Sequence, residues 1–86
     1  MRRRTPEVVV YTRQGCHLCT DAIATVRRVC AELGVAMHTV DIDTDPDLQA
    51  RYTTLVPVTV IDGREHDHWR VDEERLRAAL GRRPAR

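Results

Sequence analysis

Two cysteines spaced three residues apart, Cys16 and Cys19, are the residues of this sequence best suited to chemistry. They follow an apolar run at residues 8–11 and open a pattern typical of a helix that continues to about Leu33. Across a first helical turn, two cysteines lie within the Cα separation that a disulfide tolerates. Cys16 at the helix start also faces free N–H groups and the positive end of the helix dipole, which favour thiolate over thiol. The pair therefore predicts a redox-active dithiol.

A zinc site is one alternative, because a Cys-x-x-Cys pair also forms half of many zinc centres. The remaining cysteine, Cys30, comes eleven residues after Cys19. On a helix this separation is about 16 Å along the axis, which Zn–S bonds of about 2.3 Å cannot bridge. We therefore expect no metal site and interpret Cys30 as a core thiol. The strand before the pair and the helix after it favour redox chemistry instead.

The two cysteines are expected to play different parts in disulfide exchange. Cys16, at the exposed helix start, is the expected nucleophile, whose thiolate attacks a substrate disulfide to give a mixed disulfide. Cys19 belongs to the apolar stripe of the helix, so its thiol should be less accessible and less acidic, and it is the expected resolving cysteine. A pair of inert cysteines on a scaffold without redox activity is the alternative.

Strands and helices alternate around the cysteine pair. The pattern predicts strands at residues 7–11, 35–43, 58–61 and 64–69, and helices at 17–33, from an Asp45 N-cap to Tyr52, and from an Asp72 N-cap onward. Gly34 ends the first helix, and Asp62-Gly63 is a hairpin turn. The expected inward faces are Cys19, Ile23, Val26, Cys30 and Leu33 in the first helix and Leu76, Ala79 and Leu80 in the last, which Gly81 and Pro84 end. We expect one domain at 7–81 between flexible tails at 1–6 and 82–86.

The segment from Tyr11 to Cys19 resembles the active-site segment of glutaredoxins: a strand ending in Tyr-Thr, a basic residue, then Cys-x-x-Cys. The resemblance is also strong at Val56-Pro57 and covers essentially residues 7–80. It implies an α/β, thioredoxin-like fold of the glutaredoxin type, with three layers, a four-stranded mixed sheet and three helices in the order β-α-β-α-β-β-α. Pro57 matches a proline that is cis in glutaredoxins and faces the cysteines. We expect this to leave the backbone groups of Val56 unpaired and available to an extended substrate.

A substrate site around the cysteines follows from this resemblance, and we assign to it Tyr11, Arg13, His17, Val56, Pro57 and Asp72. Arg13 matches a basic residue that contacts glutathione in glutaredoxins, although a solvated loop arginine fits equally. His17, when protonated, adds positive charge near the Cys16 sulfur and makes the disulfide more oxidising; an exposed filler of the first helical turn fits as well. Asp72 matches an acidic helix start that binds the amino end of glutathione.

Three departures separate this sequence from the glutaredoxin pattern. Gln14 replaces a proline, His17-Leu18 replaces Pro-Tyr, and Trp69-Arg70-Val71 stands where a Gly-Gly pair precedes the last helix. Glycines let backbone N–H groups approach a ligand closely, so their loss predicts that glutathione reduces this protein poorly. The expected electron donor is another low-molecular-weight thiol or a dedicated protein reductase.

Composition limits the other classes of function. The net charge is +1, with 13 acidic and 14 basic residues, so no field favours nucleic acid, and no stretch is long and apolar enough to span a bilayer. Three cysteines, an odd number, favour the reducing cytoplasm. All basic residues are arginine, which hints at a GC-rich bacterial genome. His66 and His68 form an i, i+2 pair on the edge strand, and without a third ligand we interpret them as solvated.

We therefore expect a monomeric thiol–disulfide oxidoreductase that transfers electrons to protein or low-molecular-weight mixed disulfides. It needs no cofactor beyond the Cys16–Cys19 disulfide. The alternative is a non-catalytic binding module on the same fold, either a thiol metal carrier or an adaptor.

Overall fold

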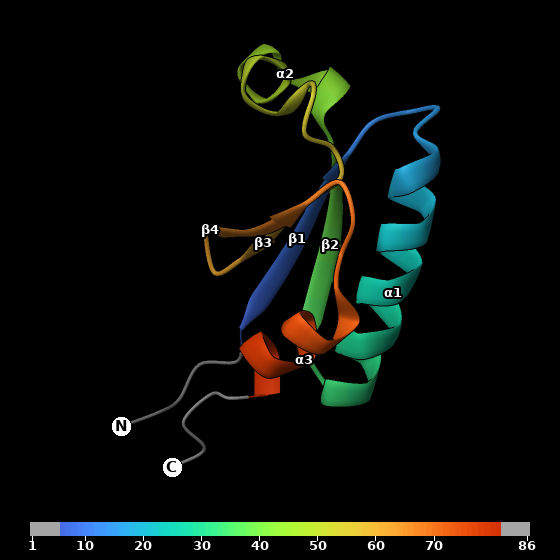
Figure 1. Cartoon of the computed structure of the whole chain (residues 1–86). Helices are drawn as coiled ribbons and strands as arrows, with labels where there is room; N and C mark the ends of the chain where they lie inside the picture. Colours follow the sequence, from blue (N-terminus) through green and yellow to red (C-terminus); the bar gives the residue numbers. More distant parts are fainter. Residues whose placement is uncertain (1–5, 82–86) are drawn as a thin grey trace.

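The computed structural model describes residues 6–81, which form a sheet flanked by helices (Figure 1). Along the chain the elements are β1 (Glu7–Thr12), α1 (His17–Leu33), β2 (Ala36–Asp41), the 3₁₀ turn η1 (Ile42–Thr44), α2 (Pro46–Tyr52), β3 (Val58–Ile61), β4 (Arg64–His68) and α3 (Glu73–Gly81). Their order confirms the predicted β-α-β-α-β-β-α arrangement. Residues 1–5 and 82–86, including the predicted helix stop Pro84, lie outside the described residues. Pro6, which we assigned to the first tail, is buried.

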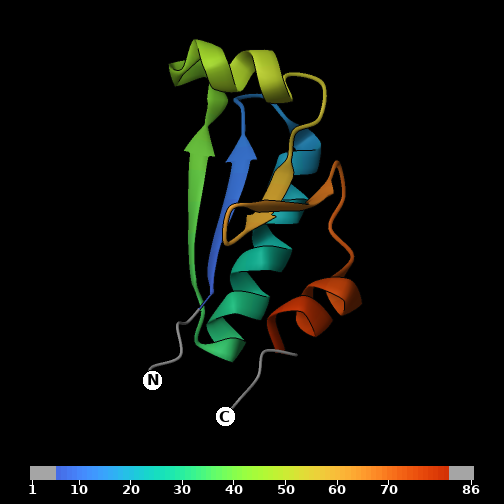
Figure 2. The same cartoon turned by 90° about the vertical axis from the view of Figure 1, so that its left-hand side faces the viewer.

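The four strands form one mixed sheet in the order β2-β1-β3-β4. β1 pairs in parallel with β2 and antiparallel with β3, and β3 pairs antiparallel with β4. Figures 1 and 2 show α1 and α3 together on one side of the sheet and α2 across the end where β1 and β2 finish. The loop from β1 to α1 therefore lies at the same end of the sheet as α2.

Helix α1 has the predicted bounds because both of its ends are capped. Gly34 ends it with a left-handed backbone, φ 69°, which glycine adopts without a Cβ penalty. The inward face differs from the prediction at its C-terminal end: Val29 is fully buried, whereas Leu33 is 40% exposed. Val29 and Cys30 pack against Leu76 of α3 in one core cluster, and Leu33 lies about one turn beyond this contact.

Helix α3 starts as predicted at Asp72, whose carboxylate accepts a hydrogen bond from the backbone N–H of Arg75 at 3.1 Å. Leu76 and Leu80 are buried against α1 and β1. Ala79, which we expected on the inner face, is exposed. Two residues four apart share one helix face, and the Leu76–Leu80 face, not the Ala79 side, is the one that packs on the sheet and α1.

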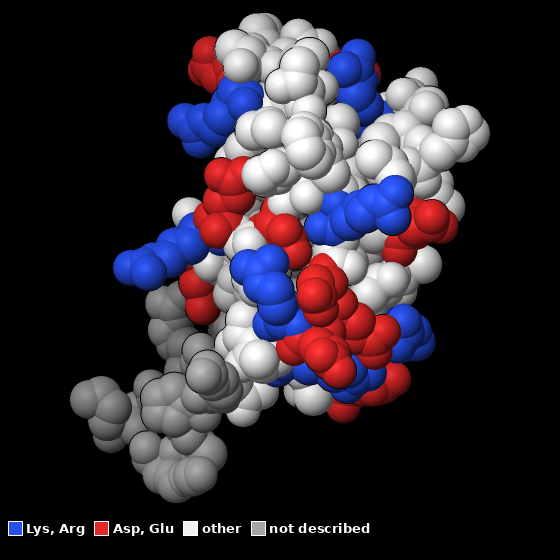
Figure 3. Space-filling model, viewed as in Figure 1, with Lys and Arg blue, Asp and Glu red and all other residues white. Residues whose placement is uncertain are grey.

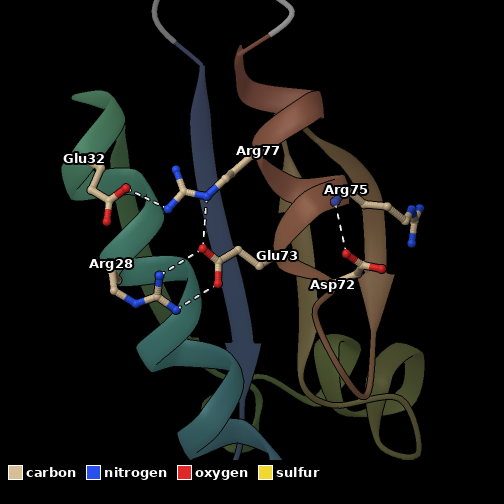
Figure 4. Close-up of polar contacts among 6 residues, drawn as sticks. All are labelled: Arg28, Glu32, Asp72, Glu73, Arg75 and Arg77. Carbon is tan, nitrogen blue, oxygen red and sulfur yellow. Dashed lines mark hydrogen bonds and ion pairs between the residues drawn. The ribbon is translucent and has the colours of Figure 1, made fainter.

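An ion-pair cluster of Arg28, Glu32, Glu73 and Arg77 connects α3 to α1 (Figure 4). The carboxylate of Glu73 accepts two hydrogen bonds from Arg28, each 3.0 Å long, and a third from Arg77 at 3.0 Å. Arg77 also donates to Glu32 at 2.7 Å. Hydrogen bonds from Arg28 and Arg77 lower the pKa of Glu73 from 4.5 to about 2. The cluster holds the start of α3, and with it the turn that precedes α3, against α1.

Two predicted strands are shorter in the structure. β2 ends at Asp41 and not at residue 43, because the Asp41 carboxylate accepts the N–H of Asp43 at 2.8 Å and starts the turn η1. Ile42, expected as a strand residue, is fully buried within this turn. β4 ends at His68 and not at Trp69, whose backbone is left-handed. The Asp62-Gly63 turn is confirmed, with positive φ at both residues.

A bulge interrupts β4 at His66. Val60 pairs with Glu65 and Thr59 with Asp67, so His66 is the extra residue of the longer strand. The Nε2 atom of His66 is buried and has no hydrogen-bond partner within residues 6–81. Burial, followed by the nearby Arg75 charge, lowers the pKa of His66. Its neighbour along the strand, His68, is exposed, so the two histidines do not share the solvated environment that we predicted.

Candidate redox site

The two cysteines form a disulfide at the start of α1. Cys16 directly precedes the helix and Cys19 lies in its first turn, with their Cα atoms 5.2 Å apart. The Sγ atom of Cys16 accepts a hydrogen bond from the backbone N–H of Cys19 at 3.2 Å, so sulfur takes the place of the oxygen of an ordinary N-cap. The first turn of α1 contains no acidic residue that would oppose the positive end of the helix dipole. Both features favour negative charge on Cys16 once the disulfide is reduced.

The surroundings of the two cysteines differ. Cys19 is 2% exposed and packs within a core cluster that includes Tyr52 and Val56. Cys16 is half-buried and lies at the edge of the same cluster. Cys16 is therefore partly accessible to solvent, whereas Cys19 belongs to the core.

Arg13 and His17 line the shallow depression that contains Cys16. The Nη1 atom of Arg13 donates a hydrogen bond of 3.4 Å to the carbonyl of Thr53, just after α2, so this side chain reaches from the β1–α1 loop to the neighbouring helix. His17 is exposed. The depression thus has two basic side chains at its border and no carboxylate among its lining residues.

The segment before β3 contains the predicted cis peptide bond between Val56 and Pro57. Pro57 is fully buried. One expectation for this segment is wrong: the backbone N–H of Val56 is not free, because it donates to the carbonyl of Tyr52 at 3.2 Å. The Val56 N–H is therefore bonded to the last turn of α2 and is not available to a substrate. Tyr11 also lies against this region, and its ring stacks on that of Tyr52 with the centroids 4.8 Å apart.

Asp72, the last of the predicted site residues, lies apart from the depression around Cys16. Its side chain caps α3, and it borders a second depression formed by the β4–α3 turn. The same depression is lined by Trp69, a residue that was not predicted to belong to the site. Trp69 is 51% exposed and adopts φ 65°. The signal that could have identified it is the loss of the Gly-Gly pair of glutaredoxins around Trp69-Arg70-Val71.

Trp69 is bound to the segment that contains the cis proline. Its backbone N–H donates to the carbonyls of Pro57 at 2.8 Å and of Leu55 at 3.3 Å. Its indole Nε1–H donates to the carbonyl of Thr54 at 2.8 Å. The indole therefore has a defined position beside residues 54–57.

Two further observations concern metal ligands and the third cysteine. Residues 6–81 contain no group of three or more His, Cys, Asp or Glu side chains arranged to hold a metal ion. Cys30 is buried in the core, and this burial raises the pKa of its thiol. In the same residues, no helix has both the length and the apolar character needed to cross a membrane.

Comparisons with known proteins relate this chain to others of the same size. A family model described as "Glutaredoxin-like domain (DUF836)" matches residues 7–81. Uncharacterised proteins of Mycobacterium tuberculosis and Mycobacterium bovis are 40% identical to it over 82 residues, which cover 90% of this chain and 84% of theirs.

Solved structures give the same result at the level of the fold. Protein Ne2328 from Nitrosomonas europaea has a TM-score of 0.78 at 29% identity, covering 93% of this chain and 96% of its own. Protein XcR50 from X. campestris has a TM-score of 0.73 at 37% identity, covering 90% and 99%. The thioredoxin of Fasciola hepatica has a TM-score of 0.66 at 28% identity, covering 92% and 81%. The predicted thioredoxin-like fold is thereby confirmed.

Proposed function

Because this chain belongs to the glutaredoxin-like domain (DUF836) family, we propose that it is a thiol–disulfide oxidoreductase that uses Cys16 and Cys19 as its dithiol. The observation that carries the proposal is the position of the disulfide, with the Cys16 sulfur as the N-cap of α1. A thiolate at a helix N-terminus is stabilised by the N–H groups and by the helix dipole, and the thiolate is the form that attacks disulfides.

In the proposed reaction the reduced protein gives two electrons to its substrate. The Cys16 thiolate attacks one sulfur of the substrate disulfide, and the first substrate thiolate leaves and takes up a proton. Cys19 then loses its proton and attacks the Cys16 sulfur of the mixed disulfide, which releases the second substrate thiol. The products are two substrate thiols and the Cys16–Cys19 disulfide. The half-buried position of Cys16 and the burial of Cys19 support this order of attack.

The electron donor that we propose is a low-molecular-weight thiol other than glutathione, or a dedicated protein reductase. Trp69-Arg70-Val71 stands where the resemblance to glutaredoxins implies a Gly-Gly pair, whose backbone N–H groups would approach the ligand closely. The loss of one or two charge-assisted hydrogen bonds costs about 1.5–3 kcal/mol each, so we expect glutathione-coupled turnover at least tenfold slower than that of an ordinary glutaredoxin. We propose the cytoplasm as the compartment, because the third cysteine is a free thiol, which suits a reducing environment.

Three cysteine variants test the proposal. The reduced protein is mixed without oxygen with a peptide disulfide, and the products are separated by mass. Cys16→Ser should form no adduct, Cys19→Ser should accumulate the mixed disulfide on Cys16, and the matched control Cys30→Ala should complete the exchange. A Cys16→Ser protein that still exchanged at the wild-type rate would refute the assignment. Stoichiometric binding of zinc or copper by the reduced protein, without disulfide exchange, would favour a metal carrier.

A further inference from the structure

Trp69 is a large apolar residue that is exposed and has a left-handed backbone. It is the chain's single tryptophan, and half of its surface is exposed to solvent. Its backbone is left-handed, at φ 65°, a conformation that is unfavourable for a bulky residue and that accumulates at functional sites. Neither burial nor backbone preference therefore selects tryptophan here.

A groove between α1 and the β4–α3 turn has Trp69 as one of its walls. On the opposite wall lies Leu18, which directly precedes Cys19 in the first turn of α1 and is 40% exposed. Leu18 and Trp69 are two of the three large hydrophobic residues that are exposed within residues 6–81. The groove is lined by Leu18, Ala22 and Thr25 from α1 and by Trp69, Arg70 and Val71 from the β4–α3 turn, with Asp21 at its border.

The charge on this part of the surface does not select an anion or a cation. Asp21 and Arg70 contribute one charge of each sign to the groove. In Figure 3, uncharged atoms cover most of the upper part of the visible face, between α2 and the start of α1, whereas charged side chains gather lower down over α3. Leu18, Ala22, Trp69 and Val71 supply the apolar part of the lining.

We propose that Trp69 is a specificity-determining residue of the exchange reaction. With Leu18 and Val71, its indole binds a large aliphatic or aromatic side chain next to the disulfide-bonded cysteine of a polypeptide substrate. The inference rests on the proposed function and names its substrate class. Leu18 directly precedes Cys19, and Cys16 is the N-cap of the same helix. The proposed side chain in the groove therefore lies within one or two residues of the sulfur that Cys16 attacks. Trp69 forms no bond in the reaction and only positions the substrate.

Two matched peptide disulfides and one small disulfide test the proposal. The peptides are symmetric disulfides of acetylated pentapeptides with either leucine or alanine on both sides of the cysteine, and the small probe is hydroxyethyl disulfide. Pre-reduced protein reacts with each in a single turnover, so no electron donor is needed. We expect the wild-type protein to reduce the leucine peptide about tenfold faster than the alanine peptide, since one apolar contact in a pocket changes rates by about this factor or more.

Variants of Trp69 separate substrate recognition from a purely structural role. Trp69→Gly should bring the leucine-to-alanine rate ratio close to one. Trp69→Phe keeps an aromatic face but loses the Nε1–H hydrogen bond to Thr54, and should retain most of the ratio. The control Leu33→Ala removes an equally exposed leucine at the other end of α1 and should leave the ratio unchanged.

Several outcomes would overturn the inference. A wild-type ratio near one, or an unchanged ratio in Trp69→Gly, would exclude apolar recognition at Trp69, while reduction of hydroxyethyl disulfide by the wild type would show that the proposed function stands. A Trp69→Phe protein with the same loss as Trp69→Gly would assign Trp69 to anchoring the segment at 54–57. If the wild type reduced none of the three probes, the proposed function would fall, and this inference with it.

Discussion

The left-handed backbone of Trp69 predicts an unusual order of stability among its variants. Trp69→Gly and Trp69→Ala both remove the indole, its hydrogen bond to Thr54 and its contacts, so these losses cancel between them. The difference that remains is φ 65°, which glycine adopts freely and alanine does not. A left-handed residue with a Cβ costs about 1–2 kcal/mol, and the greater freedom of glycine in the unfolded chain returns about 0.5–1 kcal/mol of this. We therefore expect Trp69→Gly to be more stable than Trp69→Ala by about 0.5–1 kcal/mol.

Urea unfolding of the two oxidised variants, followed by circular dichroism because both lack the fluorophore, measures this difference. For a small domain the urea m-value is about 1 kcal/mol/M, so the midpoint of the glycine variant should lie about 0.5–1 M higher. The wild-type protein and Ala24→Gly, a change at an exposed position within α1, serve as the control pair, because alanine is there favoured over glycine by about 1 kcal/mol. An alanine variant of Trp69 as stable as the glycine variant would show that the left-handed conformation is wrong or carries no cost.

Three further predictions concern the core and the titratable groups. Leu76→Ala should cost about 2–5 kcal/mol in urea unfolding, whereas Leu33→Ala should change stability by no more than about 0.5 kcal/mol; equal costs would contradict the burial of Leu76 and the exposure of Leu33. The pKa of Glu73 is lowered from 4.5 to about 2, so its contribution to stability is present above pH 4.5 and is lost as the pH falls toward 2. Glu73→Gln should therefore reduce the dependence of the urea midpoint on pH in this window, and an unchanged dependence would show that the ion-pair cluster is not formed. The pKa of His66 is lowered below 6.5, so the unfolded chain binds a proton more readily and stability should fall as the pH drops from 7 to 5; if His66→Leu shows the same fall, another group is responsible.

The elements that the sequence predicted well are those whose ends depend on local chemistry. Gly34 ends α1, Asp45-Pro46 starts α2 and Asp62-Gly63 makes the hairpin turn, and all three lie where they were predicted. Each of these residues acts on the backbone within a few positions of itself. The same holds for the cysteine pair, because a separation of three residues at a helix start already sets the distance between them.

The predictions that were wrong concern contacts between elements far apart in the sequence. Leu33 was expected in the core because it continues the spacing of the stripe, but the position of α3 decides which turns of α1 are covered. Similarly, the N–H of Val56 was expected to be free, yet the end of α2 approaches it closely enough to accept its hydrogen bond. The surroundings of Trp69 come from three segments, the start of α1, residues 54–57 and the β4–α3 turn, which only the fold brings together.

The placement of the chain's single tryptophan also gives the protein an optical property. Indole emission depends on the polarity around the ring, and Trp69 is 51% exposed to solvent. No other tryptophan contributes a background signal. A polypeptide that covered the ring would shift the emission to shorter wavelengths, whereas a small disulfide that reacted without covering it would leave the spectrum in place. Docking can thus be followed separately from electron transfer in the unlabelled protein. In a Cys16→Ser variant, which lacks the proposed nucleophile, the substrate could bind without disulfide exchange.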